Sequence, residues 1–324
     1  MGGPANNCNA MNLKEYEPLS KHTNFRIGGN ARWFIEARSE DELREAIAFA
    51  AEKGVGFCVM GGGSNTLAND DGFAGVVIQM AMRKIIIEPS TGSGRRLVVA
   101  GAGAMSAAVA RQTADAGLRG MDWAISLPGT IGGAVRGNAG CFGGDMGDVV
   151  SSVRILRGGQ AIDISRDDLQ FAYRESAIKH SSDIVLSVTM ELQPGNRDEL
   201  RATVAETLAK RKASQPLYGG SAGCVFKNYD ATEEDVQRLV TKCDIPMREM
   251  PASRRLSAGW LIDKLGLKGT RIGDAKISEE HGNFIVNLGA ATASDVAQLI
   301  ALIKTRARNE FGIQLQEEVQ YLGF

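Results

Sequence analysis

Cysteine is rare in this sequence, and neither sign of charge is in excess. Five of the 324 residues are cysteines, an odd number without a Cys-x-x-Cys pair, which argues against a disulfide scaffold and a structural zinc site. This cysteine usage favours a reduced, intracellular compartment. Lysine and arginine together number 37 and aspartate and glutamate 38, so the net charge is −1. The balance argues against a general nucleic-acid-binding protein, which would show a basic surplus or patch.

Long apolar runs are absent as well. No run approaches the roughly 18 residues that a membrane helix needs, and residues 1–8 lack the basic and apolar regions of a signal peptide. The sequence contains no HExxH, GxSxG, Walker A or EF-hand pattern, which argues against those classes of site. We expect a soluble, cytoplasmic protein that has no metal and no nucleic-acid, membrane or obligate protein partner.

Glycine is the abundant residue, at 39 positions against only 8 prolines. Most of the glycines lie in short motifs without a collagen-like period, which indicates tight loops rather than disorder. At roughly 150 residues per domain, the length predicts about two domains, with one or three as alternatives.

Apolar residues recur with helical period in some segments and with strand period in others, which predicts both helices and strands. Residues 1–20 are polar and are expected to form a loose arm. A helix is expected after Ser39, with Glu42 in a capping box and Gly54 at its end. Further helices are expected at 106–116, 200–212, 258–265 and 294–311 and after the Thr232-x-x-Asp235 cap, and strands at 57–60, 75–78, 97–100, 153–156, 161–164, 184–192, 224–226, 283–287 and 318–322. The strands between 153 and 192 alternate with period two, which is typical of a half-buried antiparallel sheet.

The first glycine-rich loop follows an expected strand and reads Gly61-Gly62-Gly63-Ser64-Asn65-Thr66-Leu67. Three adjacent glycines let the backbone approach an anion closely, and their N–H groups can surround phosphate oxygens. Ser64 and Asn65 can add side-chain donors. The loop therefore indicates either a phosphate site or a tight turn between a strand and a helix.

The second glycine-rich loop reads Pro128-Gly129-Thr130-Ile131-Gly132-Gly133-Ala134 and is followed by Asn138-Ala139-Gly140. Its glycines clear space beside a flat or anionic ligand. Two such loops, about 65 residues apart, indicate one extended cofactor held at two places. A dinucleotide fits this arrangement better than a mononucleotide, and two unrelated turns are the alternative.

A third segment, Gly101-Ala102-Gly103-Ala104-Met105-Ser106, matches the GxGxxG/A dinucleotide fingerprint only superficially. Its last position is serine, and no ribose-binding acid follows at the end of a next strand. We interpret this segment as a structural turn.

Four side chains outside these loops carry useful chemistry that the sequence alone leaves ambiguous. Arg174, in Tyr173-Arg174-x-Ser176, can clamp a carboxylate or simply lie on the surface. Cys224 lies in an apolar stretch, where a cysteine usually packs in the core. Glu318 fits a site acid or a solvated acid, and His281 fits a site residue or a surface residue.

Taken together, these segments resemble the MurB family of UDP-N-acetylenolpyruvoylglucosamine reductases. The resemblance runs from about Asn24 to Gly323, and it is specific because many short motifs keep their order and spacing. Besides the two loops and Tyr173-Arg174-x-Ser176, the motifs are Asn24-Phe25-Arg26-Ile27-Gly28-Gly29, Gln215-Pro216, Ala222-Gly223-Cys224-Val225-Phe226-Lys227-Asn228, Ala258-Gly259-x-Leu261-Ile262-Asp263, Gly266-Leu267-Lys268-Gly269, His281-x-Asn283-Phe284 and Leu315-x-x-Glu318-Val319.

The resemblance implies an α+β fold. It would combine an FAD-binding fold of the vanillyl-alcohol-oxidase (PCMH) type, in two subdomains, with a C-terminal α+β substrate-binding domain. The implied boundaries are 1–20 for the arm, 21–82 joined by 313–324 for the first subdomain, 83–213 for the second and 214–312 for the substrate domain. Only 50 positions separate Arg174 from Cys224. That is too few for the extra tyrosine loop of one subtype, so the chain resembles the shorter subtype.

The resemblance also implies non-covalent FAD, with NADPH as the hydride donor. Substrate positions of the family match Tyr173, Lys227, Asn228 and His281. The residues that match cofactor positions are Arg26, Gly28, Gly61, Gly62, Gly63, Ser64, Asn65, Leu67, Pro128, Gly129, Thr130, Gly132, Gly133, Ala134, Asn138, Gly140 and Ile184.

The implied reaction is the reduction of UDP-N-acetylglucosamine enolpyruvate to UDP-N-acetylmuramate in peptidoglycan precursor synthesis. Hydride would come from flavin N5, and Arg174 and Glu318 would stabilise the negative charge that builds beside the substrate carboxylate. Cys224 would supply the proton, at a position where the family mostly has serine. Two alternatives stay open. One is another FAD oxidoreductase of this fold that acts on an alcohol or hydroxy acid, and the other is a non-catalytic protein that binds a UDP-sugar or flavin.

Overall fold

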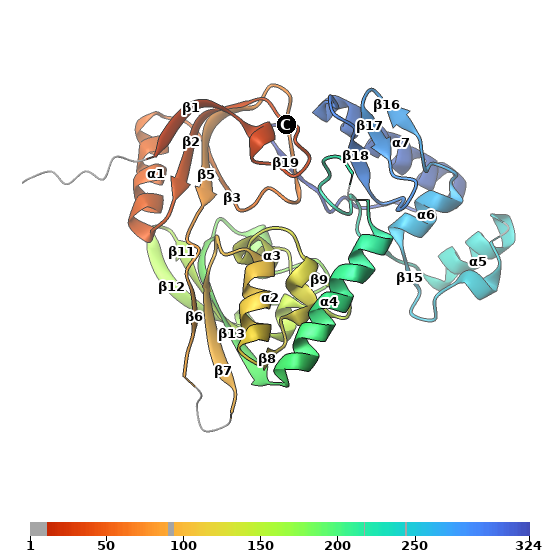
Figure 1. Cartoon of the computed structure of the whole chain (residues 1–324). Coiled ribbons are helices and arrows are strands. Elements are labelled where there is room, and N and C mark those ends of the chain that lie inside the picture. Colours follow the sequence, from red (N-terminus) through yellow and green to blue (C-terminus); the bar gives the residue numbers. More distant parts are fainter. Residues whose placement is uncertain (1–11, 90–93, 217, 244) are drawn as a thin grey trace, which may run out of the picture. The chain divides into compact units, whose positions relative to one another are not determined.

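The structure is a computed structural model that describes residues 12–89, 94–216, 218–243 and 245–324. Its contacts divide the chain into two compact units (Figure 1). The first unit lies within 12–17, 30–62 and 73–204, and the second within 18–29, 63–72 and 205–324. The second unit therefore includes two short segments from the N-terminal part of the sequence. The predicted division at 82/83 and 213/214 stays a prediction.

The first unit contains a four-stranded sheet in the order β1-β2-β5-β3. Its strands are β1 (Leu13–Pro18), β2 (Asn30–Ala37), β5 (Phe73–Met80) and β3 (Phe57–Met60), and both β2 and β3 run parallel to β5. Helix α1 (Glu40–Glu52) packs on β2 and β5. The Ser39 hydroxyl accepts the Glu42 N–H at its start, but the predicted capping box is incomplete, because the Glu42 carboxylate accepts the Arg38 N–H. Gly54 follows the end of α1 with φ +65°, as predicted.

A larger sheet in the same unit has the order β12-β11-β13-β7-β6. Its strands are β12 (Gln160–Ser165), β11 (Val150–Arg157), β13 (Ile184–Pro194), β7 (Arg96–Gly101) and β6 (Ile85–Ile87), and β8 (Leu118–Arg119) pairs with β13. All of these pairings are antiparallel, which confirms the interpretation of the period-two segments. Helices α2 (Ser106–Asp115) and α3 (Ile131–Arg136) belong to this unit, and α3 contacts β13 and β7.

The second unit contains a three-stranded sheet, β16 (Arg271–Ile272), β17 (Ala275–Ile277) and β18 (Ile285–Asn287), on which α7 (Ala293–Arg306) packs through β16 and β17. A parallel pair joins β4 (Thr66–Ala68) to β19 (Gln320–Leu322). The other elements are α4 (Arg197–Ser214), which begins in the first unit, β14 (Tyr229–Asp230), β15 (Arg255–Leu256), α5 (Glu233–Lys242) and α6 (Ala258–Lys264).

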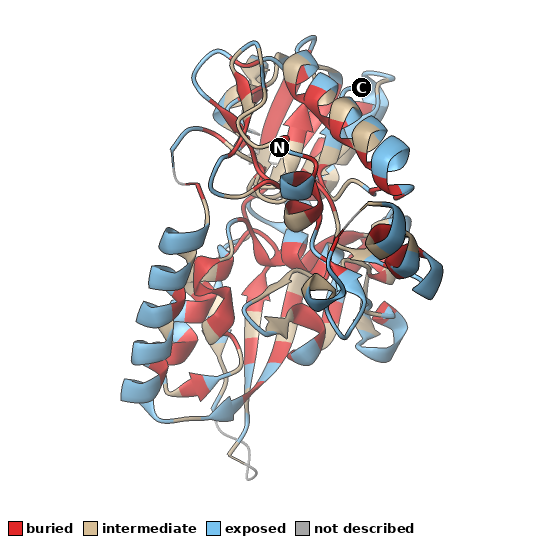
Figure 2. Cartoon of the chain, turned by 90° about the vertical axis from the view of Figure 1, so that its right-hand side faces the viewer, coloured by how far each residue is buried: buried red, intermediate tan, exposed pale blue. Residues whose placement is uncertain are grey.

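Each unit has a hydrophobic core of its own, and buried residues alternate with exposed ones along the strands and helices (Figure 2). In the first unit, Ile35, Ile78 and Val188 are fully buried. In the second, Phe25 and Phe226 are among the largest fully buried side chains. Phe25 and Leu67 pack in the second core, which explains why segments 18–29 and 63–72 belong to that unit.

Several sequence expectations are wrong in detail. The expected loose arm forms strand β1 over Leu13–Pro18 and a short 3₁₀ helix over Leu19–Lys21, while residues 1–11 lie outside the described part. The expected strand at 224–226 makes only isolated bridges, Cys224 with Phe284 and Phe226 with Glu317. The long C-terminal helix changes to π-helical hydrogen bonding over Ala307–Phe311 before Gly312 ends it with φ +66°.

Candidate active site

The two glycine-rich loops meet in the first unit, although they are far apart in the sequence. A Cβ atom on Gly61 would lie 2.3 Å from Thr130 Oγ1, and one on Gly62 would lie 3.1 Å from Gly129 Cα. Only glycine permits the first approach, because a side-chain carbon cannot come that close to an oxygen. Gln79 Nε2 also donates to the Gly61 carbonyl at 3.3 Å. This contact supports the expectation that the two loops serve one ligand.

Three hydroxyl groups near the second loop are buried without a hydrogen-bond partner in the described part of the chain. They belong to Ser106, Ser126 and Thr130. The Ser106 N–H donates to the Gly129 carbonyl at 3.0 Å, so Ser106 lies directly beside this loop. Burying a hydroxyl without a partner costs free energy, and a polar ligand would remove that cost. The glycine contacts and these hydroxyls therefore fit a phosphate-bearing cofactor such as FAD.

The other predicted cofactor residues of the first unit differ in burial and in their hydrogen bonds. The Gly132 N–H donates to the Ala102 carbonyl at 2.9 Å, which fixes the start of α3 against the end of β7. Pro128 and Gly133 are exposed, whereas Ala134 is buried. Ile184 begins β13 and is largely buried in the core, so the structure gives its side chain mainly a packing role.

Arg174 lies beside the segment that follows the second loop. Its Nη2 donates to the Gly140 carbonyl at 3.0 Å, and its φ of +58° is in the left-handed region that non-glycine residues rarely adopt. The guanidinium also lies 5.2 Å from the Tyr173 ring centre. Strained backbone of this kind is often found at functional sites, where the surrounding structure holds it.

Asn138 connects the segment after the second loop to the segment around Arg174 through its side-chain hydrogen bonds. Its Oδ1 accepts the Gly147 N–H at 2.9 Å, and its Nδ2 donates to the Ala172 carbonyl at 2.9 Å. The side chain is almost fully buried. Asn138 therefore joins the second loop to the segment that carries Tyr173 and Arg174, which is a structural role in addition to the predicted cofactor contact.

The rest of the first loop belongs to the second unit. Gly63 has φ +62°, and a Cβ there would lie 1.9 Å from the His22 carbonyl oxygen. Asn65 Nδ2 donates to the Glu318 carbonyl at 2.9 Å, so one of the side-chain donors predicted for phosphate is already used. Leu67 is fully buried in β4, and Ser64 is half-buried.

The loop 23–29 packs next to this segment. Arg26 is exposed with φ +56°, and Asn287 Nδ2 donates to the neighbouring Phe25 carbonyl at 3.0 Å. Gly28 has φ +129°, and a Cβ there would lie 2.6 Å from Ala68 Cβ. A side chain larger than glycine would therefore push this loop away from β4.

Cys224 and Glu318 lie on neighbouring segments of the second unit. The Glu318 N–H donates to the Val225 carbonyl at 2.7 Å, and the Lys227 N–H donates to the Gln316 carbonyl at 2.9 Å. Both Cys224 and Glu318 are half-buried. The structure thus brings two of the three predicted catalytic residues together in one unit and places the third, Arg174, in the other unit.

Asn283 organises the Cys224 segment and was missed as a site residue. Its Oδ1 accepts the Phe226 N–H at 2.9 Å, its Nδ2 donates to the Phe226 carbonyl at 2.8 Å, and its own carbonyl accepts the Val225 N–H at 2.9 Å. The side chain is only 3% exposed. The motif His281-x-Asn283-Phe284 was the available signal, but a sequence does not show which backbone an asparagine binds.

The three remaining predicted substrate residues surround the same segment. Asn228 Oδ1 accepts the Ala258 N–H at 3.2 Å near the start of α6, and Lys227 is half-buried. His281 stacks edge-on against Phe284, with ring centres 4.8 Å apart. Burial lowers the pKa of the His281 imidazole below its usual value, which favours the neutral ring.

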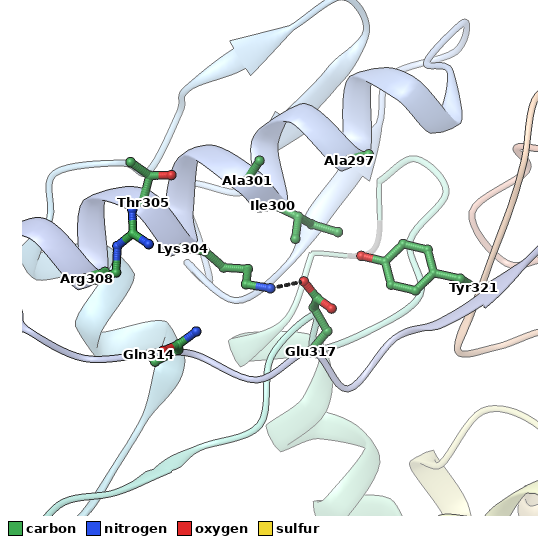
Figure 3. A pocket seen from close by; sticks show the side chains of 9 residues that line it. All are labelled: Ala297, Ile300, Ala301, Lys304, Thr305, Arg308, Gln314, Glu317 and Tyr321. Carbon is green, nitrogen blue, oxygen red and sulfur yellow. Dashed lines mark hydrogen bonds and ion pairs between the residues drawn. The ribbon is translucent and has the colours of Figure 1, made fainter. Parts of the chain in front are cut away.

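A pocket of about 320 Å³ lies elsewhere in the second unit, between α7 and the segment before β19 (Figure 3). Lys304 and Glu317 form an ion pair of 2.7 Å within it, and Tyr321 of β19 also lines it. Burial and the Glu317 charge raise the pKa of Tyr321 to about 12. None of the predicted site residues lines this pocket, although Glu317 directly precedes Glu318 on the same segment.

Comparisons with known proteins agree with these observations. Residues 215–322 match the model of the UDP-N-acetylenolpyruvoylglucosamine reductase C-terminal domain, and residues 31–163 match the FAD binding domain model. The UDP-N-acetylenolpyruvoylglucosamine reductase of Synechococcus sp. (strain CC9605) is 40% identical over 323 residues, with 98% of each chain covered. The chain belongs to the UDP-N-acetylenolpyruvoylglucosamine reductase family.

Two further members of this reductase family also match over nearly their whole length. The reductase of Desulfosudis oleivorans is 39% identical over 320 residues, covering 96% of this chain and 95% of the relative. The crystal structure of the reductase from Thermus caldophilus has a TM-score of 0.75 and 32% identity, covering 96% of this chain and 99% of that one. The family assignment confirms the predicted fold, an FAD-binding domain of the PCMH type followed by the reductase C-terminal domain.

Among the described residues, no helix is both long and apolar enough to cross a membrane. No cluster of three or more histidine, cysteine, aspartate or glutamate side chains in the same residues is arranged to hold a metal ion.

Proposed function

We propose that the protein catalyses the NADPH-dependent reduction of UDP-N-acetylglucosamine enolpyruvate to UDP-N-acetylmuramate, a step in peptidoglycan precursor synthesis. The reaction adds one hydride and one proton across the carbon–carbon double bond of the enolpyruvyl ether, while NADPH is oxidised to NADP⁺. The single observation that carries the proposal is the adjacency of Cys224 and Glu318 through the 2.7 Å bond from the Glu318 N–H to the Val225 carbonyl, in a chain of this family.

FAD, when bound, supplies the hydride transfer between NADPH and the substrate. The residues proposed to hold it are those of the two glycine-rich loops, Gly61–Leu67 and Pro128–Ala134, together with Arg26, Gly28, Asn138, Gly140 and Ile184. The support is the close approach of Gly61 to Thr130 and the buried hydroxyls beside Gly129. Backbone N–H groups in such loops can surround pyrophosphate oxygens.

The proposed catalytic residues divide the electrostatic and proton-transfer tasks. Addition of hydride to the terminal carbon leaves negative charge on the neighbouring carbon and the substrate carboxylate. The Arg174 guanidinium stabilises this charge by pairing with the carboxylate. Glu318 assists as a hydrogen-bond donor in its protonated form, because an ionised carboxylate would repel the developing charge.

Cys224 is the proposed proton donor to the carbon next to the carboxylate. A thiol has an ordinary pKa near 8.5, so it is a much stronger acid than the serine hydroxyl that most of the family has here. Asn283 fixes the backbone on the C-terminal side of Cys224 and so holds the donor segment in place. Tyr173, Lys227, Asn228 and His281 are the proposed substrate contacts.

Product analysis tests the proposal. Purified protein with FAD, NADPH and UDP-N-acetylglucosamine enolpyruvate should yield a product heavier by two hydrogen atoms, detected by mass spectrometry. Arg174→Ala should lower kcat by about 10² or more, the usual cost of removing a transition-state charge partner. Arg201→Ala, which removes an exposed arginine paired with Asp115, is the matched control and should leave kcat unchanged.

The main alternative, oxidation of an alcohol or hydroxy acid by the same fold, is not favoured, because relatives named as the reductase match over nearly the whole chain. Consumption of oxygen with a hydroxy acid, without any reduction of the enolpyruvyl sugar, would reverse this choice. Cytoplasmic location and the lack of nucleic-acid, membrane and obligate protein partners stay predictions from the sequence.

A further inference from the structure

A second pocket, of about 400 Å³, opens in the first unit away from the glycine-rich loops. Four cationic side chains and one acidic side chain line it: Arg38, Arg83, Lys84, Arg154 and Glu40. They come from the ends of β2 and β5, the start of α1 and the middle of β11. The fold therefore gathers cations from three separate parts of the sequence at one place.

The strand register separates this pocket from the proposed FAD site. Arg154 is paired with Ser187, Ser187 with Gly101, and Ile86 with Val99 in the larger sheet. Directly paired residues in an antiparallel sheet share a face, and all of these five line the pocket. They form the outer face of the sheet.

The intervening residues form the opposite face of the same sheet. Val153, Val188 and Ala100 are paired with one another and are fully buried. They share one hydrophobic core with Ile131 and Val135 of α3, the helix that contains the last four residues of the second glycine-rich loop. The pocket thus lies across the sheet from that loop and is a separate site.

The positive charge of the pocket is only partly neutralised. Arg38 pairs with Glu36 at 2.9 Å, and Arg154 pairs with Asp163 at 3.3 Å. The one acid in the lining, Glu40, is shared between Arg154, at 3.8 Å, and Arg44, which lies outside the lining.

The two remaining cations, Arg83 and Lys84, are not neutralised by these acids. Neither makes an ion pair within the described ranges, and both are exposed in the segment between β5 and β6. They are therefore available to an anionic ligand.

We propose that this pocket binds a phosphate group carried on a small apolar body. Guanidinium and ammonium groups that converge from several elements are suited to phosphate oxygens, and the Ser187 hydroxyl adds a donor. Met82, Ile86 and Val99 provide an apolar wall beside the cations, and Ile86 is 36% exposed. The phosphate can belong to a soluble phosphorylated metabolite or to a phospholipid headgroup. Both sources share this chemistry.

Binding to the FAD-saturated full-length protein tests the proposal. The probes are phenyl phosphate and inorganic phosphate, measured by titration calorimetry, and phosphatidylcholine vesicles that contain phosphatidic acid, measured by co-sedimentation. Saturating UDP-N-acetylglucosamine is present throughout, so that the sugar-nucleotide site does not contribute. The assay needs no turnover, so its result is independent of the proposed reductase activity.

The test variant is Arg83→Gln/Lys84→Gln, which removes two exposed cations without breaking an ion pair within the described ranges or removing a buried group. The matched control is Arg201→Gln/Lys210→Gln, which removes two exposed cations of α4 outside the pocket. We expect phosphate affinity to fall at least tenfold in the test variant and to stay unchanged in the control.

Each outcome decides the proposal. Saturable binding of phenyl phosphate that the test variant loses supports a soluble ligand. Binding only to the phosphatidic acid vesicles, lost in the same variant, supports a lipid headgroup. Absence of binding to every probe, or equal binding by the test variant and the wild type, overturns the proposal.

Discussion

The backbone N–H of Glu318 donates to the carbonyl oxygen of Val225 at 2.7 Å. Because Val225 directly follows Cys224, this bond holds the Glu318 backbone beside the segment that carries Cys224. The Glu318 carbonyl in turn accepts from Asn65 Nδ2 at 2.9 Å. A residue of the first glycine-rich loop, the proposed acid and the segment of the proposed proton donor are therefore linked by hydrogen bonds to the Glu318 backbone. Small movements of any one of them should affect the other two.

The first prediction concerns the proton donor. Cys224→Ser should keep substantial activity, because a hydroxyl retains a transferable proton. Cys224→Ala should lower kcat by about 10² or more, since proton transfer by a placed side chain is worth about that factor. Steady-state kinetics with the enolpyruvyl sugar measure both variants, and reduction of the bound flavin by NADPH should stay normal in each. Wild-type turnover by Cys224→Ala would remove the acid role.

The second prediction concerns the contact between the two loops. Gly61→Ala should weaken FAD binding at least tenfold, because the new Cβ would lie 2.3 Å from Thr130 Oγ1 and force the loops apart. Gly56→Ala is the matched control, since no atom lies within 4 Å of a Cβ there. Fluorescence titration of the apoprotein with FAD measures both affinities. If Gly61→Ala binds FAD as tightly as Gly56→Ala, the loops do not form the cofactor site.

The third prediction concerns Asn283. Asn283→Ala should lower the free energy of unfolding by about 2–4 kcal/mol, because it leaves a buried N–H and a buried carbonyl of Phe226 without partners. It should also reduce kcat, since the Cys224 segment loses its support. Urea unfolding measures stability, with Asn309→Ala, an exposed asparagine, as the control. An unchanged unfolding midpoint would contradict the assigned role.

The fourth prediction concerns pH. Burial lowers the pKa of His281 in the folded protein, so the unfolded chain binds this proton more readily. The contribution to stability is present above the ordinary histidine pKa of about 6.5, and it is lost as pH falls through the lower folded value. Urea unfolding at pH 8 and pH 5 should show a smaller pH dependence for His281→Gln than for the wild type. Asn309→Ala, which removes no titratable group, is the control and should keep the wild-type dependence.

Local signals in the sequence predicted much of the fold. The Ser39 and Thr232 caps and the glycine stops at Gly54 and Gly312 lie at the ends of helical segments, because capping depends on neighbouring residues. Strand β2 was not predicted. Its Arg32 and Glu36 are charged, yet the strand lies between β1 and β5 and is mostly buried. The hydrophobic pattern of one segment does not reveal which other strands will pair with that segment and bury it.

The candidate site was predicted less completely for a related reason. The glycines of both loops were identified, but the contact of Gly61 with Thr130 depends on the tertiary fold. The same holds for Asn283, whose two bonds to Phe226 cross 57 positions of sequence. The resemblance of short motifs to a known family identified Arg174, Cys224 and Glu318, which no local pattern singles out.

The most direct test of the central claim is an anaerobic visible spectrum of the FAD-loaded protein. Addition of NADPH should bleach the yellow flavin spectrum, and later addition of UDP-N-acetylglucosamine enolpyruvate should restore it, because the enolpyruvyl double bond accepts the hydride. A flavin that bleaches with NADPH but stays bleached in the presence of the enolpyruvyl sugar would contradict the proposed function.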